Sequence, residues 1–305
     1  MTDASRLATR VGQLEFANPI LPASGAFGSG KEYADFLDIG KLGGVVTKSV
    51  TLKPTRGNPP PRVAETPAGM LNAIGLQNEG VEVFLAELLP PLREKARRVV
   101  VNLAGKCADD YVRLVGRLAA APIDALEINI SCPNVKEGGI AFGVTAGAAG
   151  DLVRQLRPAA AGMPLWVKLT PNVSDIAAIA RAVEEAGADA LVVANTFLGM
   201  AVDIERRRPV LANITGGLSG PAIHPLTLRL VWQTRQAVSC PIVAAGGVAG
   251  VGEVVAFLLA GASAVEVGAM NFVEPGICGR LVDELDAWLE RRGETAAGII
   301  GTLKT

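Results

Sequence analysis

The sequence predicts an α/β fold, a single (β/α)8 TIM barrel with long loops at its C-terminal face. Short apolar runs rich in β-branched residues recur along the 305 residues, and most of them alternate with stretches of helical periodicity. Near-continuous apolar strands are typical of a parallel sheet that is buried on both faces. Eight such runs in a chain of this length favour a closed barrel over the alternative, an open doubly wound sheet.

The barrel elements follow one another in order along the chain. The expected strands are short apolar runs that lead into small or polar residues: Pro19–Ser24, Gly44–Ser49, Val99–Ala104, Ala125–Ser131, Leu165–Thr170, Ala190–Thr196, Pro241–Gly246 and Ala264–Ala269. Apolar residues at helical spacing predict helices over Asp109–Ala121, Gly147–Arg157, Ile176–Ala186, Leu226–Val238 and Gly252–Ala260. No linker or shift in composition divides the chain, so one domain spanning residues 1–305 is expected.

Two connections are much longer than the others. Leu52–Asn78 follows the second expected strand, and Phe197–Gly220 follows the sixth. Five prolines, from Pro54 to Pro67, should make the first connection stiff enough to form a fixed wall of a pocket. Both connections follow the C-terminal ends of strands, where barrel enzymes build their active sites.

The composition argues against several classes of partner. Half of the residues are hydrophobic and the formal net charge is −1, so neither nucleic acid nor an anionic membrane surface is indicated. No apolar run reaches the roughly 18 residues that a membrane-spanning helix needs, and the segment from Met1 to Phe16 lacks the apolar core of a signal peptide. Four cysteines without C-x-x-C spacing predict neither a disulfide framework nor a metal site. A soluble, cytoplasmic protein is expected.

One cysteine differs from the others in its surroundings. Glu127–Asn134 reads Glu-Ile-Asn-Ile-Ser-Cys-Pro-Asn, which places Cys132 where a buried strand runs into a loop, between the amides of Asn129 and Asn134. We interpret Cys132 as a proton-transfer group of an active site, and the glycine-bearing stretch from Val135 to Gly143 as a lid over it. Free cysteine is commonly a buried, inert residue, and this is the expectation for Cys107, Cys240 and Cys278.

Polar residues gather at the C-terminal ends of the other expected strands: Lys48, Ser49, Asn102, Lys168, Asn195 and Thr196. A single lysine beside an apolar strand commonly snorkels to the surface, but Lys48 and Lys168 should emerge on the same barrel face. Together they predict a site that stabilises negative charge on a substrate or cofactor. His224, the only histidine, is expected to be a surface or helix-capping residue, so a general base must be a cysteine, a carboxylate or a lysine.

Glycines after the last two expected strands indicate a phosphate site. The seventh strand leads into Gly246 and Gly247, and the eighth into Gly268 and Ala269. Barrels commonly bind phosphate with these two loops, because glycine lets backbone N–H groups approach the oxygens closely. A Gly-Gly pair alone also fits a tight turn, but the two positions together predict a phosphorylated cofactor or substrate. Gly25–Gly30 lacks the Rossmann spacing, so a nicotinamide cofactor is not expected to bind a Rossmann domain in this chain.

Four segments follow the order of the motifs of one known family. They read Thr-Lys-Ser at 47–49, Asn-Ala-Ile-Gly-Leu-Gln-Asn at 72–78, Asn-Ile-Ser-Cys-Pro-Asn at 129–134 and Asn-Thr at 195–196. With them the chain resembles class 1 dihydroorotate dehydrogenase over almost its whole length. The cysteine marks class 1, because the membrane-associated class 2 enzymes have serine there. The stretches at 57–72 and 132–139 resemble the NAD-linked 1B subclass rather than the fumarate-linked 1A subclass.

The resemblance implies the cofactor FMN, which would lie across the barrel mouth. By motif position, the residues that would contact FMN are Ser24, Lys48, Ser49, Asn102, Asn129, Lys168, Ala194, Gly220, Gly246, Gly247, Gly268 and Ala269. The family usually has threonine at the last of these positions, so Ala269 could contact the phosphate only through its backbone N–H. Orotate would be bound by Lys48, Asn72, Ala73, Ile74, Gly75, Leu76, Asn129, Asn134, Asn195 and Thr196.

The resemblance also implies the reaction, oxidation of dihydroorotate to orotate in the synthesis of pyrimidines. Asparagine amides offer a donor and an acceptor to the alternating N–H and C=O groups of the pyrimidine edge, and a site built from four of them would reject rings without these groups. Our hypothesis is that the Cys132 thiolate takes the C5 proton while C6 delivers hydride to flavin N5. Lys168 would stabilise the negative charge of the reduced flavin.

In the 1B subclass a second subunit, which carries FAD and a [2Fe–2S] cluster, passes the electrons to NAD. The resemblance therefore implies such a partner, with a catalytic homodimer at the core of a heterotetramer. Clustered cysteines and a Rossmann fingerprint are not found in this sequence, which is consistent with that division of labour.

Other functions fit part of the pattern. The same barrel could belong to the fumarate-linked subclass or to a dihydropyrimidine dehydrogenase, and an assay of the electron acceptor separates these. A cofactor-free phosphosugar isomerase would share the phosphate glycines but would bind no flavin. A non-catalytic scaffold would have no need of Lys48, Cys132 and Lys168.

Overall fold

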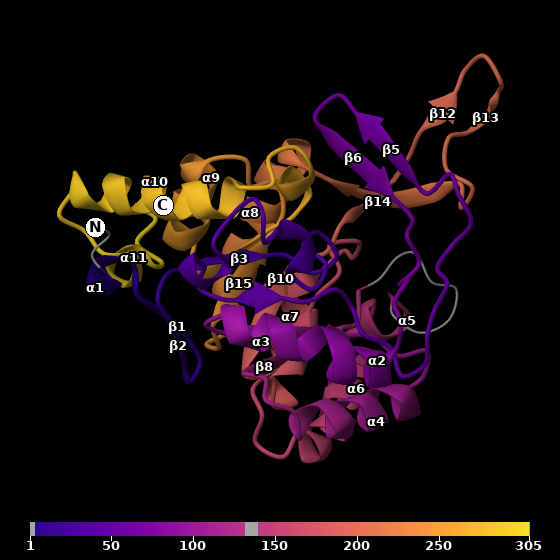
Figure 1. Cartoon of the computed structure of the whole chain (residues 1–305), viewed down its shortest axis with the longest axis horizontal. Helices are drawn as coiled ribbons and strands as arrows, with labels where there is room; N and C mark the ends of the chain where they lie inside the picture. Colours follow the sequence, from indigo (N-terminus) through magenta and orange to yellow (C-terminus); the bar gives the residue numbers. More distant parts are fainter. Residues whose placement is uncertain (1–3, 132–139, 305) are drawn as a thin grey trace.

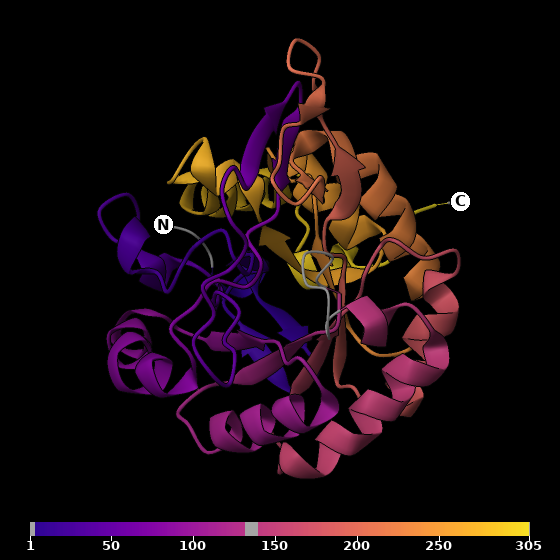
Figure 2. The same cartoon turned by 90° about the vertical axis from the view of Figure 1, so that its right-hand side faces the viewer.

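A ring of parallel strands surrounded by helices forms the body of the protein, as the computed structural model shows for residues 4–131 and 140–304 (Figures 1 and 2). Within these residues the strand order is β3-β16-β15-β10-β9-β8-β7-β4, and a hydrogen bond from Gly43 N to Ile20 O, 3.1 Å, links the two ends of the ring. The predicted (β/α)8 barrel is confirmed. Its strands are β3 (Ile20–Pro22), β4 (Val45–Val46), β7 (Val99–Leu103), β8 (Ala125–Asn129), β9 (Leu165–Lys168), β10 (Ala190–Val193), β15 (Ile242–Ala245) and β16 (Ala262–Val267).

The inside of the barrel is a packed core at its N-terminal end. Alternate strand residues point inward and form one buried cluster, which includes Leu21, Val100 and Trp166. An antiparallel hairpin of β1 (Thr9–Val11) and β2 (Leu14–Phe16) adds Val11 and Phe16 to this cluster. The Phe16 and Trp166 rings lie 6.0 Å apart between centroids. Because this end is filled by apolar side chains, polar chemistry inside the barrel is confined to the other end.

The outer helices match the expected ones to within three residues at either end. They are α4 (Ala108–Ala119), α6 (Ala146–Ala159), α7 (Ile176–Glu185), α8 (His224–Arg235) and α9 (Val251–Leu259). Asp175 accepts a hydrogen bond from Ala178 N and so caps α7. On α4 the helical spacing that predicted it also sets its buried face, which carries Tyr111, Leu114, Val115 and Leu118.

Two helical segments lie outside the expected set. Before β7 the chain forms α2 (Val81–Val83), a π-helical turn η3 (Phe84–Leu88) and α3 (Leu89–Lys95), and after β16 it forms α10 (Ile277–Glu290). The two prolines at the start of α3 obscure this helix in the sequence, because proline disrupts the interior of a helix. In the first turn proline is tolerated, since its missing N–H would have no partner within the helix there. The short elements are α1 (Ala4–Leu7), α5 (Ile140–Gly143), α11 (Ala296–Ile299), η1 (Lys31–Tyr33), η2 (Ile39–Lys41), η4 (Pro221–Ile223) and η5 (Ala269–Phe272). Across the described ranges, no helix combines the length and apolar character needed to span a membrane.

The two long connections form a second sheet, and their expectation as simple loops is wrong. In the order β11-β14-β6-β5, this antiparallel sheet stands above the barrel (Figure 1). Leu71, Ala73 and Leu211 form its own small buried cluster, which accounts for the pairing of segments so far apart in sequence. The strands are β5 (Val63–Thr66), β6 (Gly69–Asn72), β11 (Phe197–Met200) and β14 (Thr215–Ser219), and the outlying pair is β12 (Val202–Asp203) and β13 (Arg208–Pro209).

Gly220 is expected to be essential for this sheet. Its φ is +103°, and a Cβ there would lie 2.5 Å from the Cα of Gly69. Gly220→Ala should lower the free energy of unfolding by about 3 kcal/mol, because steric overlap adds to backbone strain. Gly162→Ala is the matched control, since φ there is +87° but nothing lies within 4 Å of the added Cβ. Equal losses for both variants in urea denaturation would contradict the packing argument.

Candidate active site

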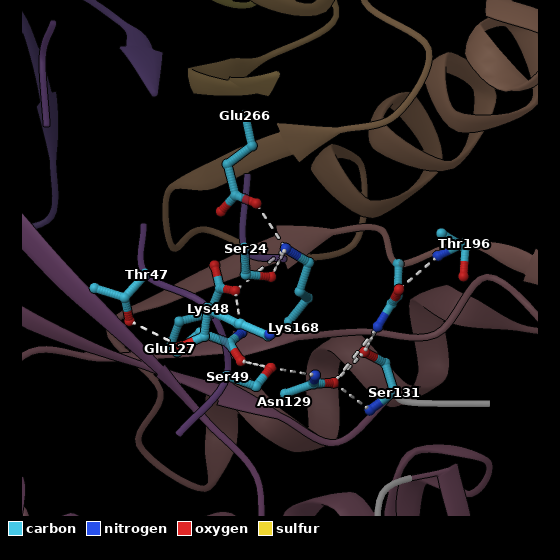
Figure 3. A network of polar contacts seen from close by, with 12 residues as sticks. Ser24, Thr47, Lys48, Ser49, Glu127, Asn129, Ser131, Lys168, Thr196 and Glu266 are labelled. Carbon is cyan, nitrogen blue, oxygen red and sulfur yellow. Dashed lines mark hydrogen bonds and ion pairs between the residues drawn. The ribbon is translucent and has the colours of Figure 1, made fainter. Parts of the chain in front are cut away.

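Inward-facing positions change from apolar to polar toward the C-terminal ends of the strands. On β8 the series is Ala125, Glu127 and Asn129, and on β9 Lys168 follows Trp166. All of these residues are buried, and strands of period two place them one above the other inside the barrel. Figure 3 shows the resulting polar network. The order of residues along β8 and β9 places it next to the apolar core inside the barrel.

Lys168 lies buried in this network and does not snorkel to the surface. Its Nζ lies 2.6 Å from Glu266 Oε2, 3.2 Å from Glu127 Oε1 and 3.3 Å from Ser24 Oγ (Figure 3). Burial alone would lower the pKa of the ammonium, but the facing carboxylates outweigh burial and raise this pKa well above its usual value. A fixed positive charge therefore sits beneath the barrel mouth.

A chain of hydrogen bonds extends from Glu127 to the neighbouring strands. Asn102 Nδ2 donates to Glu127 Oε1, and Ser49 Oγ donates to Asn102 Oδ1. Asn129 Nδ2 lies 3.4 Å from Ser49 Oγ. Because each side chain is buried and held by its neighbour, the orientation of the amides is set before any ligand binds.

A second set of contacts ties the segment that follows β10 to the end of β8. Asn129 Oδ1 accepts from Ser131 Oγ at 2.8 Å, and Asn195 Nδ2 donates to the same hydroxyl at 2.8 Å. Thr196 N donates to Asn195 Oδ1 at 2.8 Å. Ser131, which was not among the predicted site residues, therefore aligns two of the predicted amides.

The small sheet meets the barrel mouth at Thr196. A Cβ on Gly217 would lie 1.9 Å from Thr196 Oγ1, so the β14 backbone is packed directly on this side chain. Asn72 Nδ2 donates to Gly217 O at 3.3 Å, which brings the third predicted amide beside Thr196. The prediction that distant motifs share one site is supported by these contacts.

The family model described as "Dihydroorotate dehydrogenase" matches residues 6–289 of this chain. The chain belongs to the dihydroorotate dehydrogenase family.

Relatives named "Dihydroorotate dehydrogenase B (NAD(+)), catalytic subunit" cover almost the whole chain. The Bacteroides thetaiotaomicron protein is 47% identical over 302 residues, which are 98% of this chain and 99% of the relative. The Trichlorobacter lovleyi protein is 49% identical over 300 residues, 98% of each chain. That of Anoxybacillus flavithermus is 49% identical over 290 residues, 95% of this chain and 93% of its own.

Lys48 is the second lysine that the sequence predicted at the barrel mouth. Its backbone N donates to Gly28 O at 3.0 Å, and its side chain forms no ion pair with any other described residue. Burial and the nearby Arg62 lower the pKa of Lys48, while Glu32 and Glu79 oppose that shift. The ammonium is therefore available to an anionic ligand, in contrast to that of Lys168.

The predicted phosphate residues lie at the ends of β15 and β16. A Cβ on Gly247 would lie 2.4 Å from His224 N, so this loop is packed against the start of α8. In the described ranges, the N–H groups of Gly247 and Ala269 donate to no backbone oxygen. A Cβ on Gly268 would meet only Ala23 Cβ, at 3.8 Å, within 4 Å. Free donors beside open space fit an anionic phosphate.

The remaining predicted residues are less directly placed. The side chain of Ala73 is packed inside the small sheet, and Ile74 O accepts a hydrogen bond from Asn58 N at 2.9 Å. A ligand beside this segment would therefore meet its backbone more than its side chains. Gly75 and Leu76 have φ of +74° and +59°. Ala194, at the end of β10, donates its N–H to Ala245 O at 3.0 Å. Cys132, Asn134 and residues 135–139 of the expected lid lie outside the described residues.

His224 lies where η4 meets α8: it is the C-cap residue of η4 and the first residue of α8, and its half-buried ring packs edge-on to Phe257 with 4.7 Å between centroids. One expectation about a single residue is wrong. Cys107 is exposed rather than buried. Burial raises the pKa of Cys278 to about 12, which is consistent with an inert thiol, and burial with the nearby Glu184 does the same for Cys240.

The two carboxylates of the network were missed by the sequence argument. Glu127 and Glu266 are the acidic residues of the mostly apolar strands β8 and β16, and both are fully buried. A buried carboxylate is rare unless it is paired. An acidic residue at an inward-facing position of a strand was therefore the sequence signal that could have identified Glu127 and Glu266.

Proposed function

We propose that this chain is the catalytic subunit of an NAD-linked dihydroorotate dehydrogenase, which oxidises dihydroorotate to orotate in pyrimidine biosynthesis. The observation that carries the proposal is the buried Lys168 at the centre of a preorganised amide network, on the barrel face where such enzymes react. Similarity to catalytic subunits of this name over nearly the full length supports it.

The amides of Asn129, Asn195 and Asn72, with that of Asn134, would bind the pyrimidine ring. Ser131 fixes the first two, so their free donors and acceptors are aimed before the substrate arrives. A ring without matching N–H and C=O groups would leave buried amides unpaired, which costs about 1–3 kcal/mol for each group. Lys48 would pair with the substrate carboxylate, because its side chain has no ionic partner among the described residues.

FMN would be held between the Lys168 network and the glycine loops. The residues that would contact it are Ser24, Lys48, Ser49, Asn102, Asn129, Lys168, Ala194, Gly220, Gly246, Gly247, Gly268 and Ala269. Among the described residues, the N–H groups of Gly247 and Ala269 donate to no backbone oxygen, and these donors with the open space beside Gly268 fit its phosphate. The missing hydroxyl at Ala269 leaves that contact to backbone. When bound, FMN would accept the hydride from C6 of dihydroorotate.

The protein side chains would handle the proton and the charge. Cys132, as thiolate, would remove the C5 proton, and it follows Ser131, whose hydroxyl is fixed by two amides. Lys168 would stabilise negative charge that develops beside it, since its ammonium is fixed and shielded from water. A partner subunit with FAD and a [2Fe–2S] cluster would carry the electrons to NAD, around a catalytic homodimer.

The electron acceptor tests this proposal. The purified chain is expected to show the visible absorption of bound flavin, and dihydroorotate should bleach that absorption without oxygen. Fumarate alone should not restore it, whereas NAD should do so once the partner subunit is added. A colourless protein would favour the cofactor-free isomerase, and rapid recovery with fumarate would assign the chain to the other subclass.

A further inference from the structure

Glu266 has no part in the binding roles above, yet it holds Lys168 most closely. It lies on the inner face of β16, and Lys168 reaches it from β9 across the positions of β10 and β15. The Nζ–Oε2 distance is 2.6 Å, against 3.2 Å to Glu127 Oε1 on the adjacent strand (Figure 3). Glu266 therefore sets the direction of the ammonium inside the barrel.

The two carboxylates are not equally supported. Glu127 Oε1 accepts from Asn102 as well as from Lys168. Among the described residues, Glu266 has Lys168 as its single hydrogen-bond donor, whereas Glu127 has two. The second oxygen of each carboxylate, Glu127 Oε2 and Glu266 Oε1, is buried without a partner there. The neighbouring strands β3 and β15 present the apolar side chains of Leu21, Val243 and Ala245 to this interior. The described charged groups that face Glu266 are thus Lys168 and Glu127.

The balance of charges around Lys168 decides whether Glu127 and Glu266 are both ionised. Two ionised carboxylates around one ammonium would leave a negative charge uncompensated in a dry interior, which is strongly unfavourable. One proton removes this charge, and the less supported Glu266 is where it belongs. Burial and the nearby Glu127 raise the pKa of Glu266, whereas Lys168 and hydrogen bonds lower the pKa of Glu127 although burial opposes that.

We propose that Glu266 is a positioning residue that works as a neutral carboxylic acid: it accepts the hydrogen bond that holds Lys168 in place and does not cancel the ammonium charge. The consequence rests on the proposed function, because the bound flavin is what would experience that charge. With a neutral Glu266, the group of Lys168, Glu127 and Glu266 is neutral overall. An ionised Glu266 would make it negative and would disfavour the addition of electrons beside it.

A matched pair of glutamine variants tests the assignment in the flavin-loaded enzyme. Glutamine keeps the shape of glutamate without a charge, so Glu266→Gln exchanges one neutral group for another. Glu127→Gln removes a real negative charge, and it should favour flavin reduction by about tenfold or more in the equilibrium constant. The midpoint potential of the flavin measures both effects. A shift at Glu266→Gln as large as that at Glu127→Gln would overturn the proposal.

Two further readouts separate this inference from the proposed function. The infrared carbonyl band of a protonated carboxylic acid should be present at neutral pH and disappear in Glu266→Gln, whether or not flavin is bound; its absence from the unmodified protein would refute the neutral state. Glu266→Ala, which removes the acceptor, should shift the flavin potential more than Glu266→Gln. Equal shifts would refute the positioning role. A protein that binds no flavin would disprove the proposed function, while the infrared band would still report on Glu266.

Discussion

Lys168→Met is expected to lower the free energy of unfolding by about 3–5 kcal/mol at neutral pH. It should also slow the reduction of the bound flavin at least ~100-fold. Methionine fills a similar volume but leaves Glu127 and Glu266 buried without a cation. The rate falls because the fixed positive charge beside the reacting ring is lost. Urea denaturation and anaerobic stopped-flow reduction by dihydroorotate measure the two effects.

The stability loss should depend on pH in a defined direction. In the unmodified protein Lys168 has a raised pKa, so its stabilisation is complete below its unfolded pKa and is lost only as pH rises through the folded value. Glu127 has a lowered pKa, so its stabilisation is present above its unfolded pKa and is lost as pH falls through the folded value. In Lys168→Met the buried carboxyls must be protonated to fold, and the deficit should shrink toward acid pH.

Lys106→Met serves as the control for the loss of a lysine charge. This residue is exposed, and its replacement should change the free energy of unfolding by no more than about 0.5 kcal/mol. If Lys168→Met were as stable as this control at neutral pH, the carboxylates could not be paired with Lys168 in the way described.

Cys132→Ser is expected to slow flavin reduction by dihydroorotate by about 100- to 10,000-fold while leaving FMN bound. A serine hydroxyl is a far weaker base than a thiolate at the same position, but it fits the same space. In the unmodified enzyme the reduction rate should rise with pH through the thiol pKa, which for an unperturbed cysteine is about 8.5. That dependence should be absent from the variant.

Cys107→Ser is the matched control, since its thiol is exposed, lies at the start of α4 and takes part in none of the contacts described for the network. It should reduce its flavin at the unmodified rate. Near-normal reduction in Cys132→Ser would remove this thiol from the role of base, and loss of flavin from that variant would indicate a structural role instead.

The barrel was predictable because its signal is local. Each strand of a parallel sheet is covered on both faces, so runs such as Ile242–Ala245 are apolar throughout and can be recognised without their partners. The small sheet was not predictable, because β6 pairs with β14 and the hydrogen bond from Asn72 to Gly217 joins residues 145 apart in sequence. Closely spaced glycines such as those of β14 are typical of turns in a sequence, although here they permit close packing of the strand on Thr196.

The residues of the candidate site also divide into those that the sequence identified and those that it did not. Lys168, Asn129 and Asn195 were recognisable as polar residues at strand ends, and the structure joins them in one network. Ser131 and Glu266 were not, because their importance lies in partners on other strands.

By itself the sequence determined which residues form the barrel strands, where polar side chains follow them, and which family's motifs they match, since all three depend on neighbours along the chain. Closure of the barrel decided the rest. It sets β16 within reach of Lys168 on β9, and so places two carboxylates against one ammonium in the buried interior. The charge and direction of Lys168 follow from that arrangement, because burial makes the energy of each charge depend on its spatial neighbours.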